Sequence, residues 1–239
     1  MPLPLTFSLI SVFATLGGGW LLLGRKEWTL KYLWRFLAFG SGVIFGITFL
    51  HLIPESWRLD SRWGAGSLLV AFVTFYALEE FVVAHHACGE LTEDCHEHKF
   101  GYGALVALFL HSLSDGLAMA FSFLSSTALG VGVSTAVIVH KFSDGMTLSS
   151  LFLNQGFSRK KIWALTSVLS IATPLGLMIG LSATGLITPT VLAVLLGLAA
   201  GSFLYVAMAD ILPRLHHNKD IHSWILFLVG IGLSALYPH

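Results

Sequence analysis

Two copies of a short polar motif lie inside long apolar stretches of this chain. His111 precedes Asp115 by four residues, and His140 precedes Asp144 by the same interval. Residues four apart on a helix lie on one face, about one turn apart, so each pair can address a common partner. Two neutral imidazoles and two carboxylates make a four-ligand set of nitrogen and oxygen donors, which suits zinc and also admits iron or manganese. The spacing therefore predicts a divalent-metal site.

The depth of the two motifs strengthens this prediction. Both lie near the middle of their apolar runs, and an ionisable group at the bilayer centre costs at least ~2.5 kcal/mol on insertion scales. The plainer interpretation is a pair of helices held together by polar hydrogen bonds, without a metal. The repeated spacing favours the metal. Ser112, Ser114 and Ser143, with a glycine after each aspartate, keep these helices thin enough for close approach.

The composition indicates a membrane protein. Of the 239 residues, 11% are charged and 55% are hydrophobic, and the mean hydropathy is +0.80, whereas a soluble domain carries about a quarter charged residues. The formal net charge is zero, and no basic run suggests nucleic acid as a partner. The two cysteines, Cys88 and Cys95, form no disulfide framework.

Eight apolar runs predict an all-α, polytopic membrane protein with eight transmembrane helices, which form a single transport domain over residues 1–239. The runs cover residues 4–24, 32–53, 65–86, 101–124, 127–151, 162–182, 186–212 and 221–237.

The basic residues between these runs are unevenly distributed. One side would collect ten of them, and the other would hold only Arg58 and Arg62. The richer side comprises Arg25, Lys26, Lys31, Arg35, Lys99, Arg159, Lys160, Lys161, Arg214 and Lys219. Because cytoplasmic loops carry the excess of Lys and Arg, both termini are expected on the extracytoplasmic side of a plasma or inner membrane. The first run is interpreted as a retained helix, since its basic residues follow it rather than precede it.

An internal echo links the second and seventh runs. Gly42 precedes Pro54 by the same offset that separates Gly201 from Pro213, and the polar residues His51 and Asp210 occupy equivalent places. The two runs cross the membrane in opposite senses in this topology. Such similarity is the trace that an inverted repeat leaves in a transporter sequence, here helices 1–3 and 6–8 around a central pair, helices 4 and 5. Chance recurrence of proline near helix ends is the alternative.

With these features the chain resembles the ZIP (Zrt/Irt-like) family of metal transporters. The resemblance rests on the eight runs, the His-rich loop after the third, the paired His-centred motifs, and the stretch 199–207, which is similar to the family's seventh helix. It implies divalent-metal movement, most often of zinc, into the cytosol by alternating access, with the site on helices 4 and 5 at the midplane. The metal would be cargo, and no resident cofactor is expected.

The chain departs from the two-metal branch of that family at three positions. Where those members have ligands for a second ion, this sequence has Ser112, Lys141 and Thr173. The departure implies a single-metal site made by the four His and Asp residues. We expect the Lys141 ammonium to repel a second cation and to neutralise the carboxylates when no metal is bound. Snorkelling toward an interface is the alternative, disfavoured by its position near the middle of the run.

Other polar residues have two interpretations each. His51 and Glu55 flank Pro54 at the outer end of the second run, where they either recruit metal at an entrance or cap a helix. Glu79 and Glu80 near the inner end of the third run, with Asp210 in the seventh, either line an exit path or form ordinary hydrogen bonds and solvent contacts.

A His- and acid-rich loop is expected in the cytoplasm at residues 87–100. It lacks the ligand spacing of a zinc finger, so a closed structural site is not expected. A flexible metal-holding or sensing loop is preferred over a merely soluble linker. The candidate ligands in and beside it are His85, His86, Cys88, Cys95, His96 and His98.

Two classes of function fit a buried His and Asp set. A carrier, for zinc or with a preference for iron, manganese or cadmium, would open the site alternately to two sides. An intramembrane metallohydrolase would keep one coordination position for an activated water. The repeated motif and the internal echo favour the carrier, so we do not expect an enzyme. The expected partners are a divalent metal ion and the lipid bilayer, and a homodimer is one assembly open to it.

Overall fold

The structure is a computed structural model, which describes residues 2–86, 97–183, 185, 187–211 and 220–237. Within these ranges the chain forms helices joined by short turns and contains no strand, which confirms the all-α prediction. The elements are α1 (Pro2–Gly24), α2 (Lys26–Ile47), the π-helix η1 (Thr48–Leu52), α3 (Ile53–Leu59), α4 (Ser61–His86), α5 (Glu97–Ser125), α6 (Thr127–Asn154), α7 (Arg159–Ser182), α8 (Pro189–Tyr205), the π-helix η3 (Val206–Ile211) and α10 (Ile221–Ser234).

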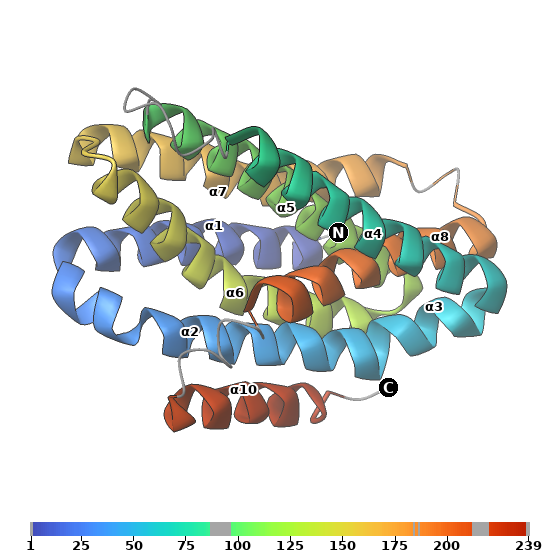
Figure 1. The fold of residues 1–239 in the computed structure, drawn as a ribbon. Coiled ribbons are helices and arrows are strands. Elements are labelled where there is room, and N and C mark those ends of the chain that lie inside the picture. Colours follow the sequence, from blue (N-terminus) through green and yellow to red (C-terminus); the bar gives the residue numbers. More distant parts are fainter. Residues whose placement is uncertain (1, 87–96, 184, 186, 212–219, 238–239) are drawn as a thin grey trace.

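The long helices lie side by side in one elongated bundle (Figure 1). The closest helix pairs are α5 with α7, α1 with α6, α4 with α8, and α2 with α10. Helix α6 runs obliquely through the middle of the bundle, and α10 lies along its edge against α2. Helix α6 also packs on α5 and on α2, so the two helices that carry the paired motifs are neighbours.

The distribution of polarity is that of a protein immersed in lipid. Large apolar side chains cover the outside, including Phe13, which is 71% exposed, and Leu69, Met178 and Leu228. Many serines and threonines are buried instead. The helical segments Leu3–Gly24, Lys26–Leu59, Ala104–Ser125, Arg159–Ser182 and Pro189–Met208 are long and apolar enough to cross a membrane, and α10 is a shorter apolar helix.

Several of these buried hydroxyls are satisfied within their own helix. On α1 the hydroxyl of Ser11 donates to the carbonyl of Ser8 at 2.7 Å, and that of Thr15 donates to Ser11 at 3.0 Å. On α8 the Ser202 hydroxyl donates to the Ala199 carbonyl at 2.9 Å. Helices with short, self-bonded polar side chains can pack closely without leaving buried donors unpaired.

The glycine after each motif aspartate brings two helix backbones together. A Cβ at Gly116 on α5 would lie 2.0 Å from the carbonyl oxygen of Thr173 on α7. A Cβ at Gly145 on α6 would lie 1.9 Å from the carbonyl oxygen of Thr15 on α1. Real Cβ atoms do not approach oxygen this closely, so only glycine permits these crossings. Each motif helix is therefore seated directly against one partner helix.

The second helical segment differs from the sequence-based boundaries. The apolar run was expected to end at Ile53, beside Pro54, but the helix begins at Lys26 and continues through η1 and α3 to Leu59. In η1 the helix widens, and the Ile53 amide donates to the Thr48 carbonyl five residues earlier. A π-turn offers a way past a proline, which lacks a backbone donor. Helix α5 likewise begins at Glu97, four residues before the expected start.

Candidate metal site

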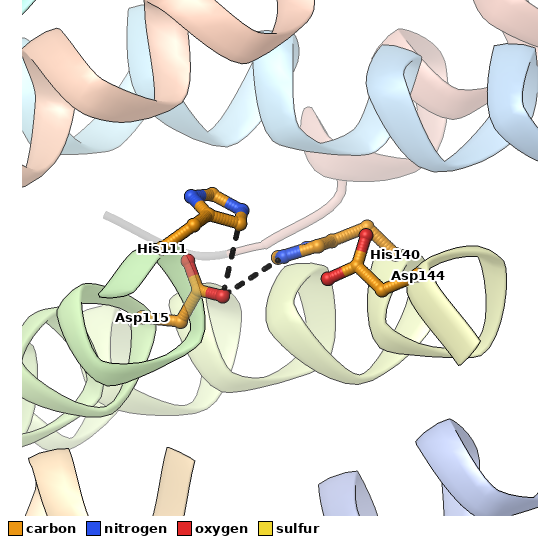
Figure 2. A group of neighbouring side chains, drawn as sticks. All are labelled: His111, Asp115, His140 and Asp144. Carbon is orange, nitrogen blue, oxygen red and sulfur yellow. Dashed lines mark hydrogen bonds and ion pairs between the residues drawn. The ribbon is translucent and has the colours of Figure 1, made fainter. Parts of the chain in front are cut away.

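The structure brings the four predicted residues together. His111 and Asp115 lie on α5, His140 and Asp144 lie on α6, and their side chains point toward one another (Figure 2). One ligand atom from each residue lies within 4.8 Å of the ligand atoms of the other three. The cluster is enclosed in the bundle, where Asp115 is fully buried and the two histidines are less than a tenth exposed. Such a group has the size and donor set of a divalent-metal site.

A backbone hydrogen bond orients the His140 ring. Its Nδ1–H group donates to the carbonyl oxygen of Ala136 at 2.9 Å. In a neutral imidazole the other nitrogen, Nε2, then carries the lone pair that can bind a metal. That nitrogen faces Oδ2 of Asp115 at 3.3 Å. Two acceptors would face each other there unless the ring is protonated or a cation lies between them.

Several polar atoms of the cluster lack hydrogen-bond partners in the described part of the chain. Both ring nitrogens of His111 and Oδ1 of Asp115 are buried and make no hydrogen bond. The closest approach between the two side chains is 3.6 Å, from His111 Nε2 to Asp115 Oδ2. Unsatisfied buried donors and acceptors are costly, and a bound metal ion would pair with one ring nitrogen of His111 and with the Asp115 carboxylate. The donor set therefore fits a metal ion.

Lys141 extends into the same cluster. Its side chain is only 1% exposed, and Nζ lies 2.5 Å from Oδ2 of Asp115 and 2.6 Å from Oδ2 of Asp144. The ammonium also donates to the hydroxyl of Ser112 at 2.8 Å. It does not snorkel to an interface, and it bridges the two carboxylates that belong to the metal-ligand set. With neutral imidazoles, two carboxylates and one ammonium leave a net charge of −1.

The remaining predicted tuning residue, Thr173, is buried on α7. Its carbonyl oxygen faces Gly116, so its backbone fixes the crossing of α7 with α5. On the opposite side, helix α8 presents Phe203 with its ring centre 6.1 Å from that of His140. Gly40 on α2 faces His140 as well, because a Cβ there would lie 3.4 Å from the His140 Cα. The site is thus enclosed by α2, α7 and α8.

The expected entrance residues lie together at the end of the bundle that contains the α3–α4 turn. His51 is buried, and its Nε2 lies 3.1 Å from the Ser234 carbonyl of α10. Glu55 is held by Arg58, and its Oε1 also accepts a hydrogen bond from Ser125. Beside them is a pocket of about 300 Å³. It is lined by Leu50, His51, Pro54, Glu55, Arg58, Ser126 and Leu129.

The other candidate residues fall outside the part of the chain whose side chains the structure describes. The backbone of Glu79 and Glu80 belongs to α4, and that of Asp210 belongs to η3. The backbone of His85 and His86 also belongs to α4, and that of His98 belongs to α5. Cys88, Cys95 and His96 lie outside the described residues.

Sequence analysis did not identify one partner of His140 and two partners of Glu55. The Ala136 carbonyl could have been suspected, because it lies one helical turn before His140. Arg58 was noted only as one of two basic residues on its side, although its spacing of three from Glu55 suits a helical ion pair. Ser125 is distant in sequence from Glu55, and no pattern linked them.

Comparison with known proteins identifies the family. Residues 83–237 match the family model described as ZIP Zinc transporter. The chain is 28% identical over 234 residues to Zinc transporter ZIP13 of Pongo abelii, with 88% of this chain and 67% of the relative covered. It is 29% identical over 253 residues to Zinc transporter ZupT of Chlorobium luteolum, with 97% and 95% covered.

A third relative is Zinc transporter YKE4 of Saccharomyces cerevisiae, which is 23% identical over 252 residues, with 89% of this chain and 72% of the relative covered. These relatives are transporters, so the metallohydrolase considered from the sequence is not supported, and the chain is not an enzyme. Together with the apolar exterior of the bundle, the family match makes it an integral membrane protein. The chain belongs to the ZIP zinc transporter family.

Proposed function

We propose that this protein moves zinc into the cytosol by alternating access, through a single metal site made by His111, Asp115, His140 and Asp144. The observation that carries the proposal is the convergence of four ligand atoms within 4.8 Å, from two neighbouring helices, in the interior of a ZIP family chain. Nitrogen and oxygen donors in equal number suit Zn²⁺, and Fe²⁺, Mn²⁺ and Cd²⁺ are the alternative substrates.

The proposed architecture is eight membrane crossings with an inverted repeat of helices 1–3 and 6–8. The two π-helices support it, because η1 and η3 fall at equivalent places of the sequence echo, each shortly before a proline. The packing supports it as well. Gly42 of α2 approaches the backbone of α10, and Gly201 of α8 approaches that of α4. In the proposed repeat α2 corresponds to α8 and α4 corresponds to α10, so the first contact maps onto the second.

The same exchange relates the helices at the centre. Gly145 seats α6 on α1, and Gly116 seats α5 on α7. Exchanging α1 with α7 and α5 with α6 therefore maps one crossing onto the other. A site built at the junction of two such halves can be opened first to one side of the membrane and then to the other, which is the basis of alternating access.

The direction of insertion follows from the basic residues. The α1–α2 turn with Arg25 and Lys26, and the α6–α7 turn with the basic segment 159–161, lie at the same end of the bundle in Figure 1. The α3–α4 turn lies at the opposite end. The positive-inside rule assigns the basic end to the cytoplasm. Both termini are then extracytoplasmic, in a plasma or inner membrane.

Lys141 is proposed to keep the site at one metal. A second cation would have to share Asp115 and Asp144 with an ammonium that already contacts both. The lysine also gives the metal-free site a counter-charge, which lowers the cost of returning empty across the bilayer. The proposed path enters past His51 and Glu55. It leaves past Glu79, Glu80 and Asp210. The loop at residues 87–100 is proposed to hold metal, and the proposed assembly is a homodimer.

Uptake of radioactive zinc into sealed proteoliposomes tests the function. The wild type should accumulate zinc, and Asp115→Asn should lower the rate at least tenfold, because the amide removes a charged ligand without changing the size of the side chain. Gel filtration should show the variant folded. Competition by iron, manganese and cadmium ranks the alternative substrates. Wild-type rates in Asp115→Asn and in a second variant, His140→Ala, would overturn the assignment of the site.

A further inference from the structure

An ion pair and a hydrogen bond converge on one carboxylate at the outer end of the bundle. Arg58 donates from Nε to Oε2 of Glu55 at 2.7 Å and from a terminal guanidinium nitrogen to Oε1 at 2.7 Å. The hydroxyl of Ser125 donates to the same Oε1. Glu55 and Arg58 belong to α3, whereas Ser125 is the last residue of α5. The carboxylate therefore connects α3 to a helix that carries the metal site.

The two members of the ion pair differ in exposure. The Glu55 side chain is 18% exposed and the Arg58 side chain is 68% exposed. A largely buried carboxylate needs a counter-charge, whereas a guanidinium that is mostly exposed can leave the carboxylate and be solvated by water without crossing the protein interior. Arg58 is thus a replaceable partner of a carboxylate that must be paired. A divalent cation carries more charge and competes for the same oxygens.

The carboxylate borders the pocket beside the α5–α6 turn. Ser126, which caps the start of α6, and Leu129 line this pocket together with Glu55 and Arg58. Ten residues separate Ser125 from Asp115 along α5, which corresponds to about 15 Å of helix. The pocket is therefore roughly half a bilayer from the buried site, on the side that the proposed topology places outside the cell.

We propose that Arg58 is a tethered competitor for the transported ion at this pocket. In the absence of metal its guanidinium holds Glu55, and Glu55 in turn holds Ser125. A divalent cation entering the pocket replaces the guanidinium on the carboxylate and draws Oε1 away from the Ser125 hydroxyl, so that the end of α5 is released when cargo arrives. This inference rests on the proposed function for the identity of the cargo.

The inner site uses the same chemistry, because Lys141 bridges Asp115 and Asp144 as Arg58 holds Glu55. Each of these three carboxylates is paired with a cation of the chain itself. The ion would pass from one tethered competitor to the next. Between the pocket and the inner site, each carboxylate named here would be handed to the ion by a cation of the chain.

Zinc binding to the purified full-length chain tests the competitor. Asp115→Asn with Asp144→Asn disables the inner site, and Asp144→Asn alone is a milder second background. In either background, Arg58→Gln should tighten zinc binding at least threefold, as measured by titration calorimetry. Adding Glu55→Gln should abolish this gain in affinity. Arg62→Gln is the matched control. It removes the same charge at the same end of the bundle, and the Arg62 guanidinium lies over the Trp63 ring, 6.0 Å from its centre. Equal affinities in Arg58→Gln and its parent, or a gain that survives Glu55→Gln, would overturn the proposal.

Hydrogen exchange tests the link to α5. In the Asp115→Asn, Asp144→Asn background, zinc should accelerate exchange of the amides at the end of α5. In the same background with Ser125→Ala added, these amides should exchange fast with or without zinc. An end of α5 that does not respond to zinc would refute the release step. The uptake assay separates the two proposals. Failure of wild-type uptake refutes transport, whereas normal uptake with no effect of Arg58→Gln on binding refutes only the competitor.

Discussion

The Lys141 ammonium lies 2.5 Å from the Asp115 carboxylate, although the two residues belong to different helices. The lysine comes from α6 and the aspartate from α5, and the same ammonium also reaches Asp144 on its own helix. Lys141 therefore supplies a positive charge that links the two motif helices. A metal that binds both carboxylates has to move or share it.

Replacing Lys141 with methionine should separate binding from transport. The substitution keeps an unbranched side chain of similar length and removes the positive charge. Zinc should bind at least as tightly, because no ammonium competes for the carboxylates. Uptake should fall roughly tenfold, because the empty site then carries two unneutralised carboxylates. Calorimetry and proteoliposome uptake on the same preparation measure the two effects.

The control for that experiment is Lys160→Met, which removes a charge from the exposed start of α7. It should leave both binding and uptake near their wild-type values. Loss of zinc binding in Lys141→Met would mean that the lysine supports the site rather than competing for it.

A double variant should change the number of bound ions. Lys141→Asp together with Thr173→Glu replaces the ammonium with a carboxylate and adds a second one on α7. Removing the repulsion and supplying oxygen ligands should raise the bound zinc from one to two ions per chain. Metal analysis of the purified protein counts them. A ratio that stays at one would show that Lys141 is not what excludes the second ion.

The close crossing of α5 and α7 predicts a packing defect. Gly116→Ala would place a Cβ 2.0 Å from the Thr173 carbonyl oxygen, so one backbone has to shift. Overpacking of this kind typically costs about 1–3 kcal/mol. The midpoint of thermal unfolding in detergent should fall. Gly66→Ala on α4 is the matched control, because a Cβ there meets no atom within 4 Å, and its midpoint should be unchanged or slightly higher.

Asp220 should contribute stability that depends on pH. Partial burial tends to raise its pKa, but hydrogen bonds from Arg35, His222 and Ser223 outweigh it and hold the pKa of Asp220 well below its usual range. A lowered folded-state pKa stabilises the fold above the unfolded value of about 4, and this stability is lost as the pH falls. The wild type should unfold at a higher temperature than Asp220→Asn at pH 6, and the difference should shrink toward pH 2.5.

An exposed carboxylate on α2 provides the comparison for Asp220. Glu27→Gln removes the same charge near the start of that helix and should not reproduce the trend. A difference between Asp220→Asn and the wild type that is constant from pH 6 to pH 2.5 would show that the aspartate acts without its charge.

The spacing of the motif residues was sufficient to predict the centre of the site. Intervals of four place His111 with Asp115 and His140 with Asp144 on single helix faces, and the cost of burying them makes convergence the natural outcome. The destination of Lys141 could not be predicted in the same way. Its long side chain can reach several directions from one backbone position, so the partner depends on how α5 and α6 cross.

Other features needed the tertiary structure for a physical reason. A proline usually marks a helix end, and only the π-turn of η1 carries the second helix beyond Pro54 to Leu59. The contact of Glu55 with Ser125 joins residues far apart in the chain. Such contacts depend on the packing of whole helices, which hydrophobic periodicity does not encode.

The hydroxyl groups that donate back to their own helix also determine how one helix can move past another. Ser8, Ser11 and Thr15 on α1 each have their donor satisfied within one turn of their own backbone, and Ser202 on α8 does the same. At these positions a sliding helix breaks no side-chain hydrogen bond with its neighbour, so displacement is opposed by packing, which at Thr15 includes the close backbone contact with Gly145. The polar side chains at these positions therefore do not tie α1 or α8 to a neighbouring helix, despite the polar composition of the interior.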